Sequence, residues 1–330
     1  MPRATCRSPT SPSSPTRTAS ACASPVPEAA PVRTLDAAET AAALPWGPLV
    51  EAMLRMFERE RRDEARAAPR TAVPLAAGGT MLLMPAADAE FAALKTVTVH
   101  AGNAAHGLPV VQGEVVLLDA ATGTRLLALD GNVLTARRTA ALSLAGAMRA
   151  GRTGAEHVLL IGAGVQARAH AEALAELWGV RRLAIHARTA AHAEHLARHM
   201  RSLGVEAQAI ADPDAVAREA DLVVAATNAL DPVVPPDLRP DACVIAIGAY
   251  RADMAEVPTA LVRRGSVFVD TLEGARREAG DLIRADVDWR AVQDFAHAVP
   301  AAAGAPVLVK TVGHALWDLA AARLAHDEGR

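Results

Sequence analysis

Two lysines stand apart in a chain whose positive charge is otherwise carried by arginine. Of the 34 basic residues, only Lys95 and Lys310 are lysines. A lysine ammonium is a compact charge whose pKa shifts readily and whose proton can be transferred, whereas an arginine guanidinium stays charged. Both positions are therefore candidates for proton transfer, and the alternative for each is chance in an arginine-rich composition.

A glycine-rich turn is the second chemical signature. The apolar run 157–161 leads directly into Gly162-Ala-Gly164-Val-Gln-Ala167, and helical sequence follows. In such a GxGxxA turn the first glycine permits the tight bend, the second lets a pyrophosphate approach the backbone, and the alanine allows close helix packing. The free N–H groups of the helix N-terminus then bind phosphate. The pattern predicts a dinucleotide site at Gly162, Gly164, Val165, Gln166 and Ala167.

The next strand-like run indicates which dinucleotide is bound. It ends in Ile185-His-Ala-Arg188-Thr189 and lacks the acidic residue that would hydrogen-bond the ribose 2′-OH of NAD. Arg188 is placed to pair with a 2′-phosphate instead. NADPH is therefore the predicted cofactor, with NADH as the alternative. The other interpretation is that Arg188 merely begins the next helix in solvent.

Polar residues follow two further strand-like runs. Thr227 and Asn228 come after LVVAA, and Gly248 and Tyr250 come at the end of CVIAIG and just beyond it. Open α/β sheets bind ligands at the carboxyl ends of their strands. These residues are predicted to contact the cofactor, and Tyr250, the only tyrosine, either lines the nicotinamide and substrate pocket or caps a loop.

Three cations in the first half lie outside ordinary charge runs. Arg70 lies between two prolines, Lys95 lies in a β-branched run, and Arg138 lies on a helical stretch. Each alone is better explained as a surface charge. Together they form a candidate clamp for a small carboxylate, in which a bidentate arginine gives orientation.

The surrounding sequence predicts the elements that position these residues. Asp36 is a candidate N-cap, and helical sequence runs from about 48 to 67. Strand-like pieces follow at 80–86, 93–101 and 113–130, the last a hairpin that turns at 121–123. From Thr135, a candidate N-cap, helical stretches alternate with strand-like runs at 157–161, 182–187, 222–227, 243–248 and 266–270. This alternation is typical of a doubly wound parallel sheet.

Composition excludes several classes of function. The chain has 330 residues, is 51% hydrophobic and carries a net charge of −3. It has no basic, aromatic-interleaved stripe for nucleic acid and no apolar run that reaches the ~18 residues of a membrane helix. Its three cysteines form no disulfide framework, which suits the cytoplasm. Residues 1–33 are rich in Pro, Ser, Thr and Arg, and we expect a disordered tail there.

These stretches resemble the ornithine cyclodeaminase/μ-crystallin family. The resemblance rests on PRT at 69–71, LKTV and GLP within 94–109, LLDAATGTRLLALDG, LTARRTAALS, LLIGAGVQARAH and VLVKTVGHALWDLA. It implies an α/β fold in which a Rossmann-type domain (136–305) joins a smaller α+β substrate-binding and dimerisation domain (34–135 with 306–330) completed by the C-terminal helix. It also implies a homodimer.

The resemblance further implies roles for individual residues. Arg70, Lys95 and Arg138 would hold the substrate carboxylate. Thr139 and the 162–167 turn would contact the dinucleotide, and Lys310 and Thr311 would lie near the nicotinamide. A structural lysine at a hinge is the alternative for Lys310.

One departure from the family pattern bears on the reaction. Cyclodeaminases carry an aspartate after a glycine pair at the end of the fourth strand, where this chain has Gly248-Ala-Tyr250-Arg251. A tyrosine, with a reference pKa of about 10, cannot act as a carboxylate base near neutral pH. The chain is thus more similar to bacterial ketimine reductases, which reduce Δ1-pyrroline-2-carboxylate to L-proline and Δ1-piperideine-2-carboxylate to L-pipecolate, in hydroxyproline or lysine catabolism.

In this interpretation Lys95 is the catalytic residue. Crowding by Arg70 and Arg138 would lower its pKa, so that it could supply the proton of the imine nitrogen. In the alternative, Lys95 only binds the carboxylate and water supplies the proton. Other candidate functions are an ornithine cyclodeaminase, an alanine-dehydrogenase-like enzyme and a μ-crystallin-like binder without activity.

A metal site can also be considered. His192, His195 and His199 share one helix face, but no acidic or cysteine partner is evident. We therefore expect an exposed helix face and no metal.

Overall fold

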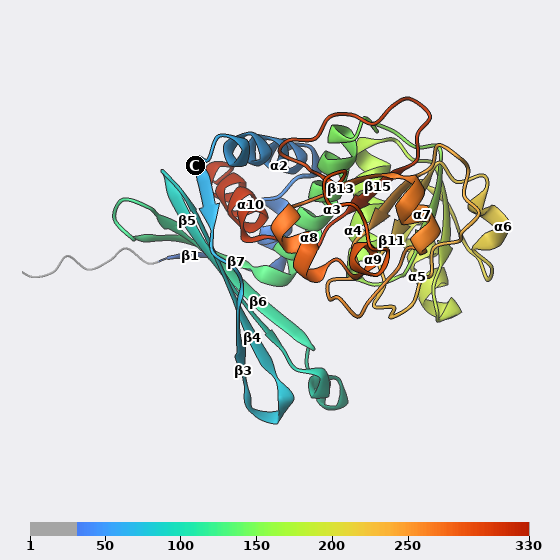
Figure 1. Cartoon of the computed structure of the whole chain (residues 1–330). Helices are drawn as coiled ribbons and strands as arrows, with labels where there is room; N and C mark the ends of the chain where they lie inside the picture. The colour runs from blue at the N-terminus through green and yellow to red at the C-terminus, as the bar shows by residue number, and fades with distance from the viewer. Residues whose placement is uncertain (1–31, 330) are drawn as a thin grey trace, which may run out of the picture. The chain divides into compact units, whose positions relative to one another are not determined.

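Two β-sheets organise the computed structural model, which describes residues 32–329. Most of the predicted tail lies outside this range, as do Cys6 and Cys22. The first sheet is mixed and has the strand order β1-β7-β6-β5-β4-β2, with β3 also paired to β4 (Figure 1). Its strands are β1 Arg33–Leu35, β2 Ala65–Ala67, β3 Thr71–Pro74, β4 Thr80–Asp88, β5 Phe91–Val99, β6 Val111–Asp119 and β7 Arg125–Asp130.

The second sheet is entirely parallel and has the order β10-β9-β8-β11-β12-β15-β13-β14. The chain runs outward from β8 through β9 and β10, then returns to the other side of β8 with β11. The strand order therefore reverses beside β8, at the place where doubly wound sheets bind ligands. Its strands are β8 His157–Ile161, β9 Arg182–His186, β10 Glu206–Ala209, β11 Leu222–Ala225, β12 Cys243–Ala246, β13 Ser266–Val269, β14 Gln293–Asp294 and β15 Val307–Lys310.

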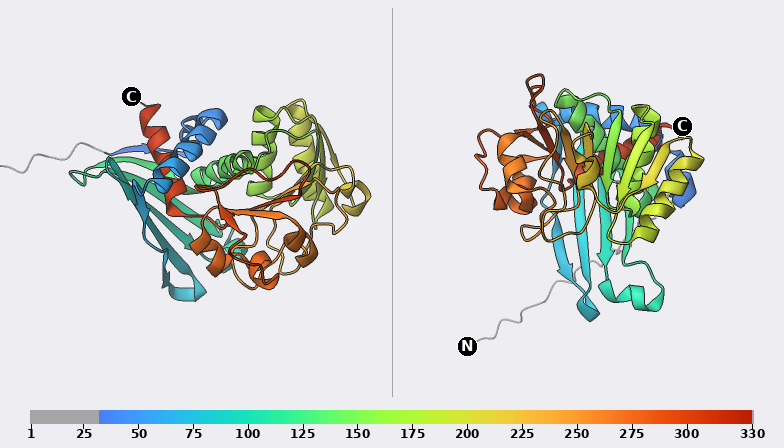
Figure 2. Two further views of the ribbon diagram at one scale, coloured as in Figure 1. Left: turned by 45° about the horizontal axis from the view of Figure 1, so that its top comes forward. Right: turned by 90° about the vertical axis from the view of Figure 1, so that its right-hand side faces the viewer.

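Helices cover these sheets and join them. Helices α2, α3 and α10 pack against one another. All three lie on one side of the first sheet, as Figure 2 shows. Between α2 and α10, the aromatic rings of Phe57 and Trp317 meet edge to face, with their centroids 5.2 Å apart. The helices are α1 Ala37–Ala42, α2 Trp46–Arg61, α3 Gly131–Arg149, α4 Val165–Leu177, α5 Ala190–Ser202, α6 Asp214–Ala217, α7 Thr259–Arg264, α8 Leu272–Glu278, α9 Gly280–Arg284 and α10 Ala315–Asp327.

Local sequence signals explain several of these boundaries. Asp36 caps α1 as predicted, in a capping box with Glu39. The predicted N-cap at Thr135 is wrong, because α3 begins at Gly131 and the carboxylate of Asp130 accepts hydrogen bonds from the backbone N–H groups of residues 132 and 133. The predicted helix at 48–67 is also too long. Its last residues form β2, because pairing with β4 outweighs their helix propensity.

The predicted fold class, a Rossmann-type parallel sheet with a smaller α+β portion, is confirmed. One boundary requires correction: β15 lies in the parallel sheet between β12 and β13, so residues 307–310 do not join the first sheet. Of the predicted C-terminal part of the substrate domain, it is α10, which follows β15, that packs on β4 and β5 of the first sheet. The division into two domains at the predicted residues stays a prediction.

Candidate active site

A cleft lies at the carboxyl ends of the parallel strands. Its volume is about 280 Å³, and its walls come from the loops after β11, β12 and β15 and from α3 and α4. The lining residues are Arg138, Thr139, Gln166, Ala226, Thr227, Ile247, Gly248, Tyr250, Thr311, Val312 and Gly313. Seven of these were predicted from the sequence as site residues, although they come from five separate segments.

Another hollow, of about 230 Å³, lies at the opposite edge of the parallel sheet. It is lined by His157, Arg182, Glu206 and their neighbours, at the amino ends of β8, β9 and β10. Parallel sheets of this type bind ligands at the carboxyl edge. The cleft at that edge is therefore the candidate active site.

The turn after β8 has the geometry of a phosphate-binding loop. Gly162 has φ of +115°, and a Cβ placed on it would lie 2.4 Å from the carbonyl oxygen of Ala226. Its N–H donates to the carbonyl of His186 at 2.8 Å, which ties the turn to β9. Only glycine fits at this position, because both the backbone angle and the space exclude a side chain.

The rest of the turn is open toward a ligand. A Cβ on Gly164 would meet no atom within 4 Å. Helix α4 begins at Val165 with no side-chain cap, so its first N–H groups are available to an anion. Gln166 lines the cleft, and its Oε1 is buried without a hydrogen-bond partner among the described residues. These features fit a dinucleotide pyrophosphate.

Glu256 holds the floor of the cleft together. Its Oε1 accepts hydrogen bonds from the N–H and hydroxyl of Thr227 at 2.7 and 2.8 Å. Its Oε2 accepts from the N–H groups of Gly248 and Ala249 at 2.6 and 3.2 Å. One buried carboxylate thus joins the loops after β11 and β12. Burial raises its pKa above the usual range, while the nearby ammonium of Lys310 opposes that shift.

Lys310 belongs to this supporting network and not to the cleft. Its side chain is fully buried, and its Nζ forms an ion pair with Asp281 Oδ2 at 3.0 Å, without the alignment of a hydrogen bond. Asp281 Oδ1 accepts hydrogen bonds from the N–H groups of Glu256 and Val257. Lys310 is buried and does not line the cleft, and its predicted contact with the cofactor stays a prediction. Thr311, the next residue, does line the cleft.

Lys95 and Arg138 meet at an acidic residue that sequence reasoning missed. Asp318 of α10 is 1% exposed, and its Oδ2 lies 2.8 Å from Lys95 Nζ. Its Oδ1 accepts a hydrogen bond from Arg138 Nε at 3.0 Å. Lys95 is on the helix-facing side of β5, and Arg138 is on α3. Side chains from these two elements therefore meet at a carboxylate carried by a third, α10. A signal existed: Asp318 is the only charged residue between Ala315 and Ala322.

Burial sets the ionisation of Lys95. It lowers the pKa of the Lys95 ammonium from 10.5 to about 8, and the positive charges of Arg138 and Arg70 act in the same direction. The carboxylate of Asp318 opposes them and favours the charged form. Lys95 is therefore an ammonium whose proton is transferable near neutral pH.

Arg70 approaches the same region from the loop before β3. Its Nη2 donates to the carbonyls of Val312 and Gly313 at 3.3 and 3.2 Å, and it pairs with Glu278 at 2.7 Å. A Cβ on Gly313 would in turn lie 3.4 Å from Arg138 Nη2. The three predicted cations are thus close together, with the turn after β15 between the two arginines.

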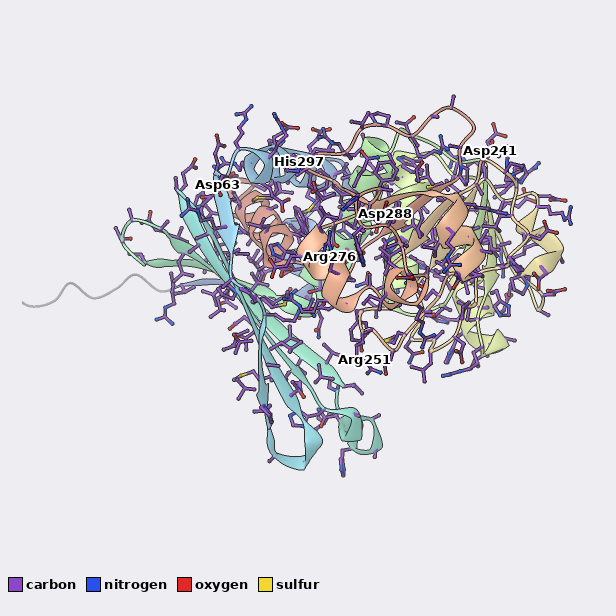
Figure 3. All side chains as sticks on the ribbon, in the orientation of Figure 1. Asp63, Asp241, Arg251, Arg276, Asp288 and His297 are labelled. Atoms are coloured by element: carbon purple, nitrogen blue, oxygen red, sulfur yellow. The ribbon has the colours of Figure 1, made fainter. Side chains whose placement is uncertain are left out.

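The other predicted residues lie around the cleft. Tyr250 is 48% exposed and forms part of its wall. Arg188 and Asn228 are exposed in the loops after β9 and β11, and Arg188 makes no ion pair with any described residue. Arg251, labelled in Figure 3, lies at the surface and pairs with Asp253. The chain therefore brings a tyrosine and an arginine to the position where the family resemblance would place a carboxylate.

The three helical histidines form no metal site in the part of the chain that the structure describes. His192 and His195 are exposed, and His199 hydrogen-bonds Glu172 at 2.8 Å. Burial raises the pKa of the Cys243 thiol to about 12, which makes it a poor nucleophile.

Within residues 32–329, no helix combines the length and apolarity needed to cross a membrane.

Comparison with known proteins identifies the family. The sequence profile of the ornithine cyclodeaminase/mu-crystallin family matches residues 35–328. The chain belongs to this family. Among curated family members it is 42% identical over 295 residues to Delta(1)-pyrroline-2-carboxylate reductase 1 of Burkholderia multivorans, covering 88% of this chain and 94% of the relative. It is 40% identical over 299 residues to a Delta(1)-pyrroline-2-carboxylate/Delta(1)-piperideine-2-carboxylate reductase of Azospirillum brasilense, with the same coverage.

A solved structure of the family agrees with the fold. The Delta(1)-pyrroline-2-carboxylate reductase of Thermococcus litoralis, determined in complex with NADH and L-proline, superposes with a TM-score of 0.83 at 26% identity. The match covers 90% of this chain and 97% of that one. The predicted family is therefore confirmed.

Proposed function

We propose that this family member reduces cyclic ketimines with a nicotinamide cofactor, converting Δ1-pyrroline-2-carboxylate to L-proline and Δ1-piperideine-2-carboxylate to L-pipecolate. The observation that carries the proposal is the convergence of Lys95 and Arg138 on Asp318, with Arg138 lining a cleft that begins at the dinucleotide turn. The names of the relatives agree with an oxidoreductase that acts on a C=N bond.

The two arginines, Arg138 and Arg70, would bind the carboxylate of the substrate. Arg138 uses Nε to bind Asp318, and its two terminal Nη atoms make no hydrogen bond to any described residue. Two such N–H groups match a carboxylate in a bidentate pair. Arg70 lies on the other side of Gly313, where it supplies a second positive charge. We propose that these two arginines fix the ring, with Tyr250 beside it.

Lys95 provides for the imine nitrogen. When bound, the nicotinamide supplies a hydride to the ring carbon that bears the carboxylate. That carbon is far more electrophilic when the nitrogen is protonated, and the Lys95 ammonium is the buried acid that can protonate it. Gly162, Gly164 and the N-terminus of α4 would hold the pyrophosphate, and Thr139, Thr227, Gly248 and Thr311 would border the nicotinamide.

The remaining assignments are also proposals. We propose a cytoplasmic protein, in keeping with the buried thiol of Cys243. We also propose a homodimer, with a second copy covering the face of the first sheet that α2, α3 and α10 leave open. Leu94 and Val111 are exposed on β5 and β6, whose ends extend beyond these helices (Figure 1). A monomer mass in light scattering would contradict the dimer.

The reaction is tested by following NADPH oxidation with Δ1-pyrroline-2-carboxylate, beside ornithine and pyruvate plus ammonia. We expect oxidation with the cyclic imine and formation of L-proline. Cofactor-dependent release of ammonia from ornithine would favour the cyclodeaminase alternative, and oxidation only with pyruvate plus ammonia would favour an alanine-dehydrogenase-like enzyme. Ligand binding without turnover of any substrate would favour the binder.

We propose NADPH as the preferred cofactor, and Arg188 tests this preference. Arg188→Ala is expected to lower kcat/KM for NADPH by about 10- to 100-fold, because one charge-assisted contact to a phosphate is lost. The value for NADH should change little. Arg198→Ala is the control, because it removes the charge of an exposed arginine on α5. It should leave kcat/KM unchanged for both NADPH and NADH. Equal effects of Arg188→Ala on the two cofactors would contradict a 2′-phosphate contact.

A further inference from the structure

Asp318 has a place in the site that the proposed reaction does not yet explain. It is a buried carboxylate on α10 whose two oxygens reach different cations on different elements. We propose that Asp318 is the positioning residue of this site: it directs the guanidinium of Arg138 toward the substrate and keeps the proton on Lys95 until the imine nitrogen takes it. This inference deepens the proposed ketimine reduction and rests on it for the identity of the proton acceptor.

The first argument is the direction of Arg138. Asp318 accepts a hydrogen bond from Nε, on one side of the guanidinium. The two Nη atoms at its end are therefore left to point toward the turn at Gly313 and the cleft. A carboxylate bound at the Nη end instead would compete with the substrate for the same donors. The contact is also buried at both partners, which are 5% and 1% exposed, so water does not weaken it.

The second argument is the charge around Lys95. The ammonium faces Asp318 from α10, Arg138 from α3 and Arg70 from the loop before β3. Burial lowers the pKa of His314, at the start of α10, while the carboxylates of Asp270 and Asp318 oppose that shift. Asp318 is therefore the anion that compensates the buried ammonium. Without it, the two guanidinium groups would act on Lys95 with no opposing carboxylate, and the ammonium would release its proton more readily.

The proton transfer is balanced. An N–H bond of the Lys95 ammonium breaks as an N–H bond forms on the imine nitrogen, which leaves a neutral lysine amine and an iminium ring. A nicotinamide cofactor held by Gly162, Gly164 and the N-terminus of α4 would supply the hydride for the ring carbon and would itself be oxidised. The lysine amine regains its proton from solvent. The carboxylate of Asp318, 2.8 Å from Lys95 Nζ, stabilises the ammonium at the start and end of the cycle.

The scarcity of lysine makes this proposal directly measurable. Protein produced with lysine labelled with ¹³C at Cε carries only two labelled side chains, at Lys95 and Lys310. The two resonances are assigned with Lys95→Met, which removes one of them. A pH titration then reports the ionisation of Lys95 without cofactor, substrate or turnover.

Asp318→Asn is the decisive variant. We expect the Lys95 resonance to titrate about one to three pH units lower than in the wild type, because an opposite charge within contact distance is lost. The alkaline limb of kcat should move by the same amount. Asp241→Asn, which removes a carboxylate from an exposed pair with Arg239, is the control and should change neither. An unchanged Lys95 titration in folded Asp318→Asn would overturn the proposal.

Asp318→Glu keeps the negative charge, and it tests the proposal if the Asp318→Asn variant does not fold. We expect Lys95 to titrate near its wild-type pH while kcat falls about tenfold or more, because the carboxylate is displaced by one methylene. Wild-type turnover at every pH would contradict the positioning role. Failure of the ketimine assay with a shifted Lys95 titration would instead remove the proposed reaction and leave the pairing intact.

Discussion

Lys95→Met is expected to lower kcat for Δ1-pyrroline-2-carboxylate by about 10²- to 10⁴-fold, the range in which a positioned general acid contributes. The wild-type enzyme should lose turnover as the pH rises through about 8, the pKa to which burial lowers the Lys95 ammonium. The sign follows from the charged form being the proton donor: it is present below that pH and lost above it. Steady-state kinetics from pH 6 to 10, roughly two units either side, would measure both effects.

Lys95→Arg separates charge from proton transfer. A guanidinium keeps a positive charge beside Asp318 but does not release its proton near neutral pH. We expect L-proline binding, measured by calorimetry, to stay closer to the wild type in this variant than in Lys95→Met, while kcat falls in both. Wild-type turnover in Lys95→Met would show that water supplies the proton and that Lys95 only binds the carboxylate.

Gly162→Ala is expected to destabilise the fold and to abolish dinucleotide binding. The left-handed φ costs about 1–2 kcal/mol for an alanine, and the new Cβ would collide with the carbonyl of Ala226 at 2.4 Å, at a further cost of about 1–3 kcal/mol. The free energy of unfolding should therefore fall by about 2–5 kcal/mol. Chemical denaturation and cofactor fluorescence would measure the two effects.

Gly164→Ala is the matched substitution in the same turn. Its Cβ meets no protein atom within 4 Å, and its φ is not in the left-handed region. The stability of the chain without ligand should stay within about 0.5 kcal/mol of the wild type. Cofactor affinity should still fall by tenfold or more, because the methyl group occupies the space of the pyrophosphate. Unchanged affinity in Gly164→Ala would contradict the predicted phosphate position.

Local patterns predicted much of the fold and half of the site. The glycine turn, the parallel strands and the hairpin at 121–123 depend on residues close together in the sequence, and each appears where predicted. The residues at the strand ends were also predictable, because the carboxyl ends of parallel strands meet at one edge. The boundaries that failed, at Thr135 and after Arg61, were decided by an earlier cap and by pairing with β4.

The acidic half of the site could not be predicted in the same way. Asp318, Glu256 and Asp281 each lie beside apolar residues in the sequence, but their partners come from distant segments. An acid on a helix or in a loop is most often solvated, and its burial depends on which elements pack over it. Lys310 shows the same limit, because its rarity marked it correctly as unusual while its neighbours in space gave it a supporting role.

The burial of both lysines has a consequence for proteolysis. A protease that cleaves only after lysine has two sites in this chain, and these two residues are 3% and 0% exposed. Lys95 lies in the first sheet and Lys310 in the second, so neither bond is accessible until its own sheet opens. The fragments ending at 95 and at 310 differ in mass. Their rates of appearance would report separately how often each half of the molecule unfolds under native conditions.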